Sequence, residues 1–174
     1  MRRVAIIQGE HAVAADPGVV ITTLLGSCVA ACLYDPVARI GGMNHFLLGE
    51  PAAHQRLATA EMARYGVHAM ELLINAMMAL GAQRASLQAH LYGGANIIAG
   101  LAAIGTSNAA FARRFMAAEG IHVAHADLGG THARKVEFLA HEGRSRCTIS
   151  AGTVREQRPR PLPTPVHVGE LELF

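Results

Sequence analysis

The chain has no tryptophan, and aromatic residues of all kinds make up only 5% of its 174 residues. A hydrophobic core must therefore be built from small and aliphatic side chains. Hydrophobic residues nevertheless account for 51% of the chain, which is the composition of a folded and not of a disordered protein. A domain of this length buries roughly 70% of its unfolded surface, so it needs neither a metal nor a disulfide for stability.

Cysteine and charge are also scarce. The three cysteines, Cys28, Cys32 and Cys147, contain no Cys-x-x-Cys pair. An odd set with this spacing argues against a disulfide framework and leaves open one reactive thiol. Charged residues make up 16% of the chain, the formal charge is +2, and the basic residues are scattered. Nucleic-acid binding usually requires Lys and Arg clustered on one face, so we expect no nucleic-acid partner.

Long hydrophobic runs are missing as well. The apolar stretches around Cys28 and Met70 are interrupted well before the roughly 20 residues that a membrane span requires. The N-terminal segment carries two arginines, but its apolar run of four residues is too short for a secretory signal. We therefore expect a cytoplasmic protein without membrane insertion.

The elements that the sequence predicts are mostly short strands. Helical spacing of apolar residues predicts helices over residues 61–80 and from Ser107 or Asn108, as N-cap, to 119, and each is followed by a glycine. β-branched and apolar runs bounded by turn signals predict strands at residues 4–7, 19–23, 29–34, 41–48, 87–92, 121–126, 135–139 and 147–150. Strand runs broken by two helices predict an α+β domain over residues 1–152. Residues 153–174 contain alternating prolines and are expected to form an extended tail.

The segment Leu25-Gly26-Ser27-Cys28 has the local design of a nucleophile turn. A strand leads into a glycine bend, and the cysteine follows. Backbone N–H groups at such a bend can converge on the oxyanion that forms when a carbonyl is attacked. The thiolate is the reactive form of cysteine, so a nearby imidazole is needed near neutral pH.

His45 is the natural partner for this cysteine. It lies in the otherwise apolar run 41–48, which we expect to pair with the strand that follows Cys28. A histidine in such a strand needs a hydrogen-bond partner, and the hydroxyl of Thr22 or Thr23 could orient its ring. From the residues alone, an inert thiol and a satisfied core histidine are the commoner roles for Cys28 and His45.

Metal binding is the competing chemistry for a chain with 10 His. On a strand, Cys28 and Cys32 would be about 13 Å apart at about 3.3 Å per residue, too far to share a zinc ion or a disulfide. His122 and His125 would fall on opposite faces of their strand. We expect neither a metal site nor a cofactor, and a metal-dependent hydrolase or oxidase stays as the weakest alternative.

Several motifs together resemble the CheD family of bacterial chemoreceptor glutamine deamidases. The most specific pair is Leu25-Gly26-Ser27-Cys28 followed by Gly41-Gly42-Met43-Asn44-His45-Phe46. The similarity continues, in order, through Leu91-Tyr92-Gly93-Gly94-Ala95, Asp127-Leu128-Gly129-Gly130 and Arg134-Lys135-Val136, and covers about residues 4–150.

This resemblance implies a catalytic set of Cys28, His45 and Thr22, which lies six residues before the cysteine. Thr23 is the second choice for the threonine, and Gly26 and Ser27 would support the oxyanion. The implied fold is similar to that of toxin-type cysteine deamidases, with packed mixed β-sheets flanked by helices in α/β/β/α-like layers.

The implied activity is cysteine-dependent conversion of glutamine side chains to glutamate in the cytoplasmic helical region of chemoreceptors. Some family members also hydrolyse methyl esters there, and some bind a CheC-like phosphatase. We expect recruitment to membrane-bound receptors, with Asn44, Gly93, Gly94 and Gly129 contacting the substrate helix. Ser107 and Ala133 depart from the family pattern. Together with the basic, proline-rich tail, Ser107 keeps open a non-catalytic alternative, a regulator that binds receptors or a CheC phosphatase.

Overall fold

The computed structural model describes residues 1–48, 59–97 and 103–151, and the side chains from residue 65 on in the first helix. The elements follow the chain in the order β1 (Arg2–Ala5), β2 (His11–Ala14), β3 (Val19–Leu25), β4 (Val29–Asp35), β5 (Ile40–Asn44), α1 (Thr59–Ala79), a 3₁₀ turn (Arg84–Ser86), β6 (Gln88–Gly93), α2 (Ile104–Glu119), β7 (His122–Leu128), β8 (Ala133–Leu139) and β9 (Arg144–Ser150). The expected tail at 153–174 lies outside the described residues. Neither described helix is long and apolar enough to cross a membrane.

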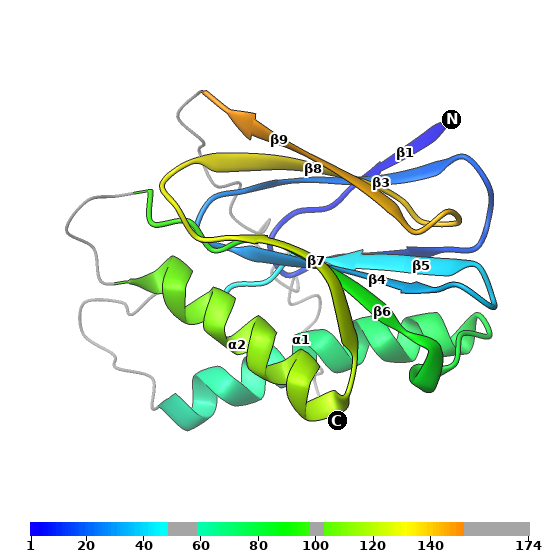
Figure 1. The fold of residues 1–174 in the computed structure, drawn as a ribbon, viewed down its shortest axis with the longest axis horizontal. Helices are drawn as coiled ribbons and strands as arrows, with labels where there is room; N and C mark the ends of the chain where they lie inside the picture. The colour runs from blue at the N-terminus through cyan, green and yellow to red at the C-terminus, as the bar shows by residue number, and fades with distance from the viewer. Residues whose placement is uncertain (49–58, 98–102, 152–174) are drawn as a thin grey trace, which may run out of the picture.

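The strands form two packed sheets. One has the order β1-β3-β8-β9 and the other the order β2-β5-β4-β6-β7. In both sheets a single parallel pair, β1–β3 or β6–β7, accompanies antiparallel neighbours, so both are mixed. Both helices cover the face of the five-stranded sheet that points away from the four-stranded one (Figure 1). The α+β class with packed mixed sheets is confirmed, but the described layers run sheet, sheet, helices, without the expected second helical layer.

The central strand β4 separates two hydrophobic cores. Ala30 and Cys32 point into the core between the sheets, whereas Ala31 and Leu33 point into the core beneath the helices. This alternation follows from the two-residue period of a strand. It explains why β4 is apolar at nearly every position, because each of its faces is covered.

Some element boundaries differ from those expected. The strand β2 was not predicted. The strand β5 ends at Asn44, and beyond it Val29 and Phe46 form one further bridge in the described part of the chain. The predicted N-cap of the second helix is wrong, because α2 begins at Ile104 and Asn108 lies buried inside it. The predicted glycine stop after this helix is confirmed, since Gly120 adopts a left-handed conformation with φ +67°.

Candidate active site

The bend that carries Cys28 connects β3 to β4. The backbone carbonyl groups of Gly26, Ser27 and Cys28 each accept a hydrogen bond. Their donors are, in order, the N–H of Ala95 at 3.1 Å, the side-chain amide of Asn108 at 2.9 Å and the N–H of Gly94 at 2.8 Å. The loop after β6 and the helix α2 therefore fix three consecutive peptide groups of the bend.

The opposite edge of this bend carries amide protons. The N–H and C=O of a trans peptide point in opposite directions, and the described residues contain no cis peptide bond. The N–H groups of Ser27 and Cys28 therefore point away from the glycine loop and from Asn108. Backbone N–H groups at a bend are the kind of donor that can stabilise an oxyanion.

The strand pairing brings Cys28 and His45 to the same face of the five-stranded sheet. Val29 and Phe46 exchange both backbone hydrogen bonds, at 3.0 and 2.9 Å, in the same register that pairs Cys32 with Met43. This register makes Cys28 and His45 diagonal neighbours, a separation that larger side chains can span. Cys28 is fully buried and His45 is 6% exposed.

The imidazole of His45 is held in one tautomer by Thr23. The hydroxyl oxygen of Thr23 lies 2.8 Å from Nδ1 of His45 and 2.8 Å from the carbonyl oxygen of Ile6. A carbonyl can only accept, so the Thr23 hydroxyl donates its one hydrogen bond to the carbonyl of Ile6. The N–H at Nδ1 of His45 therefore donates a hydrogen bond to the oxygen of Thr23. Nε2 then carries a lone pair, and it has no hydrogen-bond partner among the described residues. Burial lowers the pKa of His45 to about 4, so the ring is neutral near pH 7 and able to accept a proton.

The structure places the two threonines on opposite faces of β3. Neighbouring residues of a strand point to opposite faces. Thr23 is buried between the sheets, whereas Thr22 shares the outer face of the four-stranded sheet with its neighbour Glu137 on β8. The position implied by the resemblance, Thr22, therefore does not contact His45 through its hydroxyl.

Sequence reasoning missed Gln8, which approaches the cysteine from the loop between β1 and β2. Its Oε1 atom lies 3.9 Å from Sγ of Cys28 and accepts the hydrogen bond of the thiol. A glutamine in a short loop carries no distinctive signal, so only the fold reveals this contact.

Asn44, one of the residues expected to contact substrate, is buried between the five-stranded sheet and the helices. It is 2% exposed and points toward the helices. Its Oδ1 accepts a hydrogen bond from the N–H of Ala31 at 3.0 Å, and its amide lies 3.4 Å from the carbonyl oxygen of Ala69 on α1. The side chain therefore ties the five-stranded sheet to the helix.

The loops that contain Gly93-Gly94 and Gly129 pack against the bend that carries Cys28. Gly93 and Gly94 are buried, and a Cβ on Gly93 would lie 2.2 Å from the carbonyl oxygen of Cys28. The N–H of Gly129 donates to the carbonyl of Gly93 at 2.9 Å, so the two loops meet here. Gly129 is half-buried, with open space around its Cα. Of these three, only Gly129 lies at the surface for a substrate to reach.

The remaining cysteines are poorly placed for nucleophilic chemistry. Cys32 is 1% exposed, and burial raises its thiol pKa well above the ordinary range. Burial also raises the pKa of Cys147 to about 11. In the described part of the chain, no three His, Cys, Asp or Glu side chains lie together in a way that could hold a metal.

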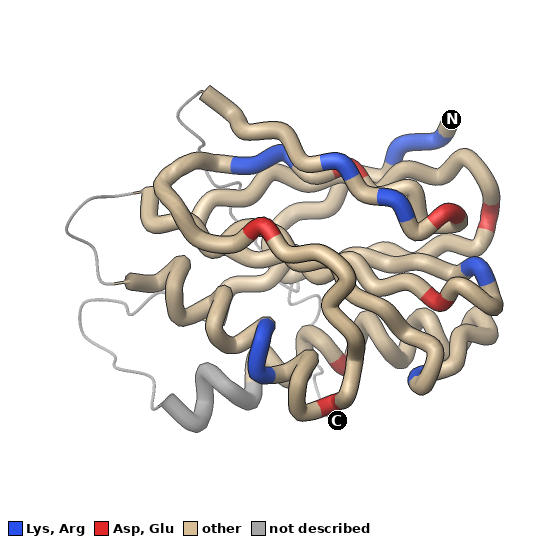
Figure 2. Tube along the Cα trace, in the orientation of Figure 1, with Lys and Arg blue, Asp and Glu red and all other residues tan. Residues whose placement is uncertain are grey.

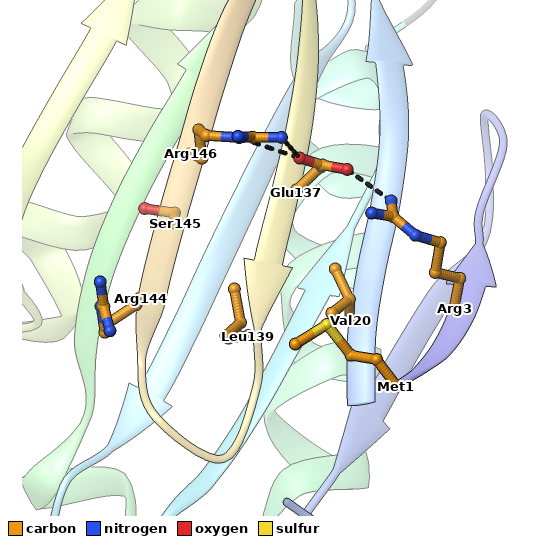
Figure 3. A pocket seen from close by; sticks show the side chains of 8 residues that line it. All are labelled: Met1, Arg3, Val20, Glu137, Leu139, Arg144, Ser145 and Arg146. Atoms are coloured by element: carbon orange, nitrogen blue, oxygen red, sulfur yellow. Dashed lines mark hydrogen bonds and ion pairs between the residues drawn. The ribbon is translucent and has the colours of Figure 1, made fainter. Parts of the chain in front are cut away.

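A separate hollow lies on the outer face of the four-stranded sheet. Figure 3 shows Glu137 at its centre, between Arg3 and Arg146, with its carboxylate paired to both guanidinium groups. Lys and Arg also recur along β1, β8 and β9 in Figure 2. The hollow lies on the side of β3 opposite to Thr23, so it is not part of the Cys28 site.

Comparison with known proteins identifies the family of this chain. Residues 47–148 match the family described as CheD chemotactic sensory transduction. A protein of Agrobacterium fabrum named "Probable chemoreceptor glutamine deamidase CheD" is 48% identical over 99% of this chain and 97% of its own. A protein of Zymomonas mobilis with the same name is 51% identical over 91% of this chain and 84% of its own. A protein of Rhizobium leguminosarum with the same name is 50% identical over 99% of this chain and 96% of its own.

Among solved structures, a Neisseria meningitidis protein described as DUF152 aligns with a TM-score of 0.41 and 15% identity over 69% of this chain. The alignment covers 51% of that protein, so this chain spans about half its length.

The fold and the site together define a class: α+β proteins of two packed mixed sheets with a cysteine and a neutral, threonine-bound histidine on one sheet face. Within that class, the sequence matches extend over nearly the whole length of the chain and its relatives. The chain belongs to the CheD family.

Proposed function

We propose that this protein deamidates glutamine side chains of chemoreceptors, with Cys28 as nucleophile and His45 as general base. The names of its relatives support the reaction, because each describes a chemoreceptor glutamine deamidase. The observation that carries the residue assignment is the neutral His45 ring, held by Thr23 on the face that it shares with Cys28. An imidazole in this state can take the proton of a nearby thiol.

In the first half-reaction, the lone pair on Nε2 of His45 accepts the Cys28 proton as Sγ attacks the carboxamide carbon of the glutamine. The C=O electron pair moves onto oxygen, where the N–H groups of Ser27 and Cys28 stabilise the negative charge. The imidazolium then protonates the departing nitrogen. The C–N bond breaks, ammonia leaves and a thioester to Cys28 remains.

In the second half-reaction, the same neutral ring activates a water molecule. The water oxygen attacks the thioester carbon while its proton passes to Nε2 of His45. The tetrahedral intermediate collapses with cleavage of the C–S bond. His45 returns the proton to sulfur, and a glutamate side chain leaves.

The substrate in this proposal is the cytoplasmic helical region of membrane-bound receptors, where the enzyme would act after recruitment. A methyl ester in the same region would react by the same steps, with methanol as leaving group in place of ammonia. A CheC-like phosphatase is the proposed regulatory partner. The half-buried Gly129 is the proposed point of contact with the substrate helix.

The test is peptide mass mapping of a recombinant receptor cytoplasmic fragment after incubation with the protein. We expect a gain of about 1 Da at defined glutamines with the wild-type protein and none with Cys28→Ala. Cys147→Ala is the matched control, because it removes a half-buried thiol elsewhere and should retain activity. Full activity of Cys28→Ala would refute the nucleophile. No change with folded wild-type protein and several receptors would favour the non-catalytic binding role.

A further inference from the structure

The loop between β1 and β2 is fixed to the two residues that orient the imidazole. The carbonyl of Ile6 accepts the hydroxyl proton of Thr23. The N–H of Gly9 donates to the carbonyl of His45 at 2.8 Å, and the N–H of His45 donates to the carbonyl of Glu10 at 3.0 Å. Both sides of Gln8 are thus anchored to the Thr23–His45 pair.

The loop is also closed on itself. The N–H of Glu10 donates to the carbonyl of Ile7 at 3.0 Å, and the carboxylate of Glu10 accepts the N–H of Ile7 at 2.9 Å. Gln8 lies inside this closed turn. Its backbone is therefore held in place relative to the candidate base before any substrate arrives, which is the arrangement that catalytic side chains require.

The side chain of Gln8 is suited to both protonation states of the cysteine. At rest, Oε1 lies 3.9 Å from Sγ and accepts a hydrogen bond from the thiol. A carboxamide also carries two N–H donors, and rotation about its terminal torsion exchanges the oxygen and nitrogen positions. The same side chain can therefore donate to a thiolate or to an oxyanion formed beside it.

We propose that Gln8 is a further catalytic residue, which hydrogen-bonds the Cys28 thiol at rest and donates an amide proton to the negative charge that develops during attack. The contribution to deamidation rests on the function proposed above, whereas the contribution to thiolate formation does not. No bond to Gln8 forms or breaks, because the thiol proton passes to His45 and the amide only changes its hydrogen-bond partner.

The first test measures the thiol alone, without any receptor. Alkylation of Cys28 by iodoacetamide is followed between pH 6 and 10 by mass mapping of the peptide that contains it. Cys32 and Cys147 do not interfere, since each peptide is read separately. Gln8→Met keeps the length of the side chain without its hydrogen bonds, and Gln8→Glu replaces the donor by a negative charge. Gln88→Glu makes the same charge change at an exposed position on β6.

We expect Gln8→Glu to move the midpoint of the alkylation profile up by about one pH unit, because a carboxylate near sulfur disfavours the thiolate. Gln8→Met should move it upward by a smaller amount, and Gln88→Glu should leave it unchanged. Circular dichroism melting curves establish that each variant is folded. An unchanged midpoint in both folded Gln8 variants would overturn the proposal. Faster alkylation of Gln8→Met at every pH would also overturn it, because the side chain would then only cover the thiol.

The second test measures deamidation of the receptor fragment. Loss of an oxyanion donor lowers kcat by about 10²-fold in other enzymes, so we expect a comparable fall in kcat for Gln8→Met with little change in KM. A rise in KM alone would overturn the catalytic role. If wild-type protein deamidates no receptor but the alkylation midpoints still move as expected, the proposed function fails and the action of Gln8 on the thiol stands.

Discussion

The hydroxyl of Thr23 lies 2.8 Å from Nδ1 of His45, and this contact connects the two sheets at the candidate site. Thr23 belongs to β3 in the four-stranded sheet, whereas His45 follows β5 in the five-stranded sheet. The orientation of the candidate base thus depends on how the sheets pack. Because the Thr23 hydroxyl donates its hydrogen bond to the carbonyl of Ile6, it can only accept from His45. Thr23 therefore fixes the tautomer of the His45 ring as well as its position.

Replacing Thr23 by valine should lower kcat for deamidation by about 10- to 100-fold, the size of effect seen when the partner that orients a metal-binding histidine is removed. The isosteric valine keeps the shape but leaves Nδ1 of His45 without its acceptor, so the ring can adopt the wrong tautomer. Thr22→Val makes the same change one residue earlier, on the outer face, and should keep activity within about two-fold. Steady-state kinetics on a receptor fragment would compare the kcat values of the two variants. A larger fall in kcat for Thr22→Val than for Thr23→Val would restore the assignment to Thr22.

The sequence did not distinguish these threonines for a physical reason. The run from Val19 to Leu25 is apolar or β-branched on both faces, with Leu24 on the outer face and Ile21 and Leu25 on the inner one. A two-residue alternation identifies the buried face only when the other face is polar. The inner face of β3 can therefore be identified only from its packing against the second sheet.

Other features were predictable because a local pattern determines them. The glycine bend before Cys28, the pairing of the strand containing Met43 with β4, and the glycine after α2 each follow from nearby residues. By contrast, Gln8 and Asn108 reach the bend from segments distant in sequence, at 20 residues and 81 residues from their partners. Their roles depend on tertiary contacts, which no local pattern encodes.

Burial of the neutral His45 ring predicts a loss of stability in acid. Its pKa is lowered to about 4 in the folded protein from an ordinary 6.5, so the unfolded chain binds the proton more tightly. The stability from neutral His45 is complete above pH 6.5 and is lost as pH falls toward 4, by about 3 kcal/mol in all at 1.36 kcal/mol per pH unit. Urea unfolding from pH 7 to 4.5 should show a steeper loss for wild type than for His45→Gln. Replacing the exposed His68 by glutamine should leave the steep slope unchanged, and parallel slopes for wild type and His45→Gln would contradict the prediction.

Asn108 should contribute to both stability and activity. Its Oδ1 accepts the N–H of Leu48 at 3.1 Å, and its amide donates to the carbonyl of Ser27 at 2.9 Å, with the side chain 1% exposed. Asn108→Ala removes both buried contacts, so we expect a loss of about 3 kcal/mol in the free energy of unfolding. The exposed Asn75 offers the control, and Asn75→Ala should change stability by less than about 0.5 kcal/mol.

A second variant separates the two contacts of Asn108. Asn108→Asp retains the acceptor for Leu48 but places a carboxylate oxygen against the carbonyl of Ser27. The repulsion should displace the bend and lower kcat at a temperature where the variant is folded. Equal kcat values for wild type and Asn108→Asp would show that the bend holds its position without this donor.

Gly93 and Gly129 should respond very differently to alanine, although both were expected to contact substrate. At Gly93, where φ is +107°, an added Cβ would lie 2.2 Å from the carbonyl oxygen of Cys28, so the backbone of the bend must move. We expect Gly93→Ala to cost more than about 3 kcal/mol in stability and to abolish deamidation. At Gly129, where φ is +87°, nothing lies within 4 Å of an added Cβ, and only the left-handed strain of about 1–2 kcal/mol applies. Urea unfolding measures both costs. If folded Gly129→Ala raises KM for the receptor fragment while kcat is kept, the surface role of this loop in substrate binding is supported, whereas an unchanged KM assigns the loop to structure alone.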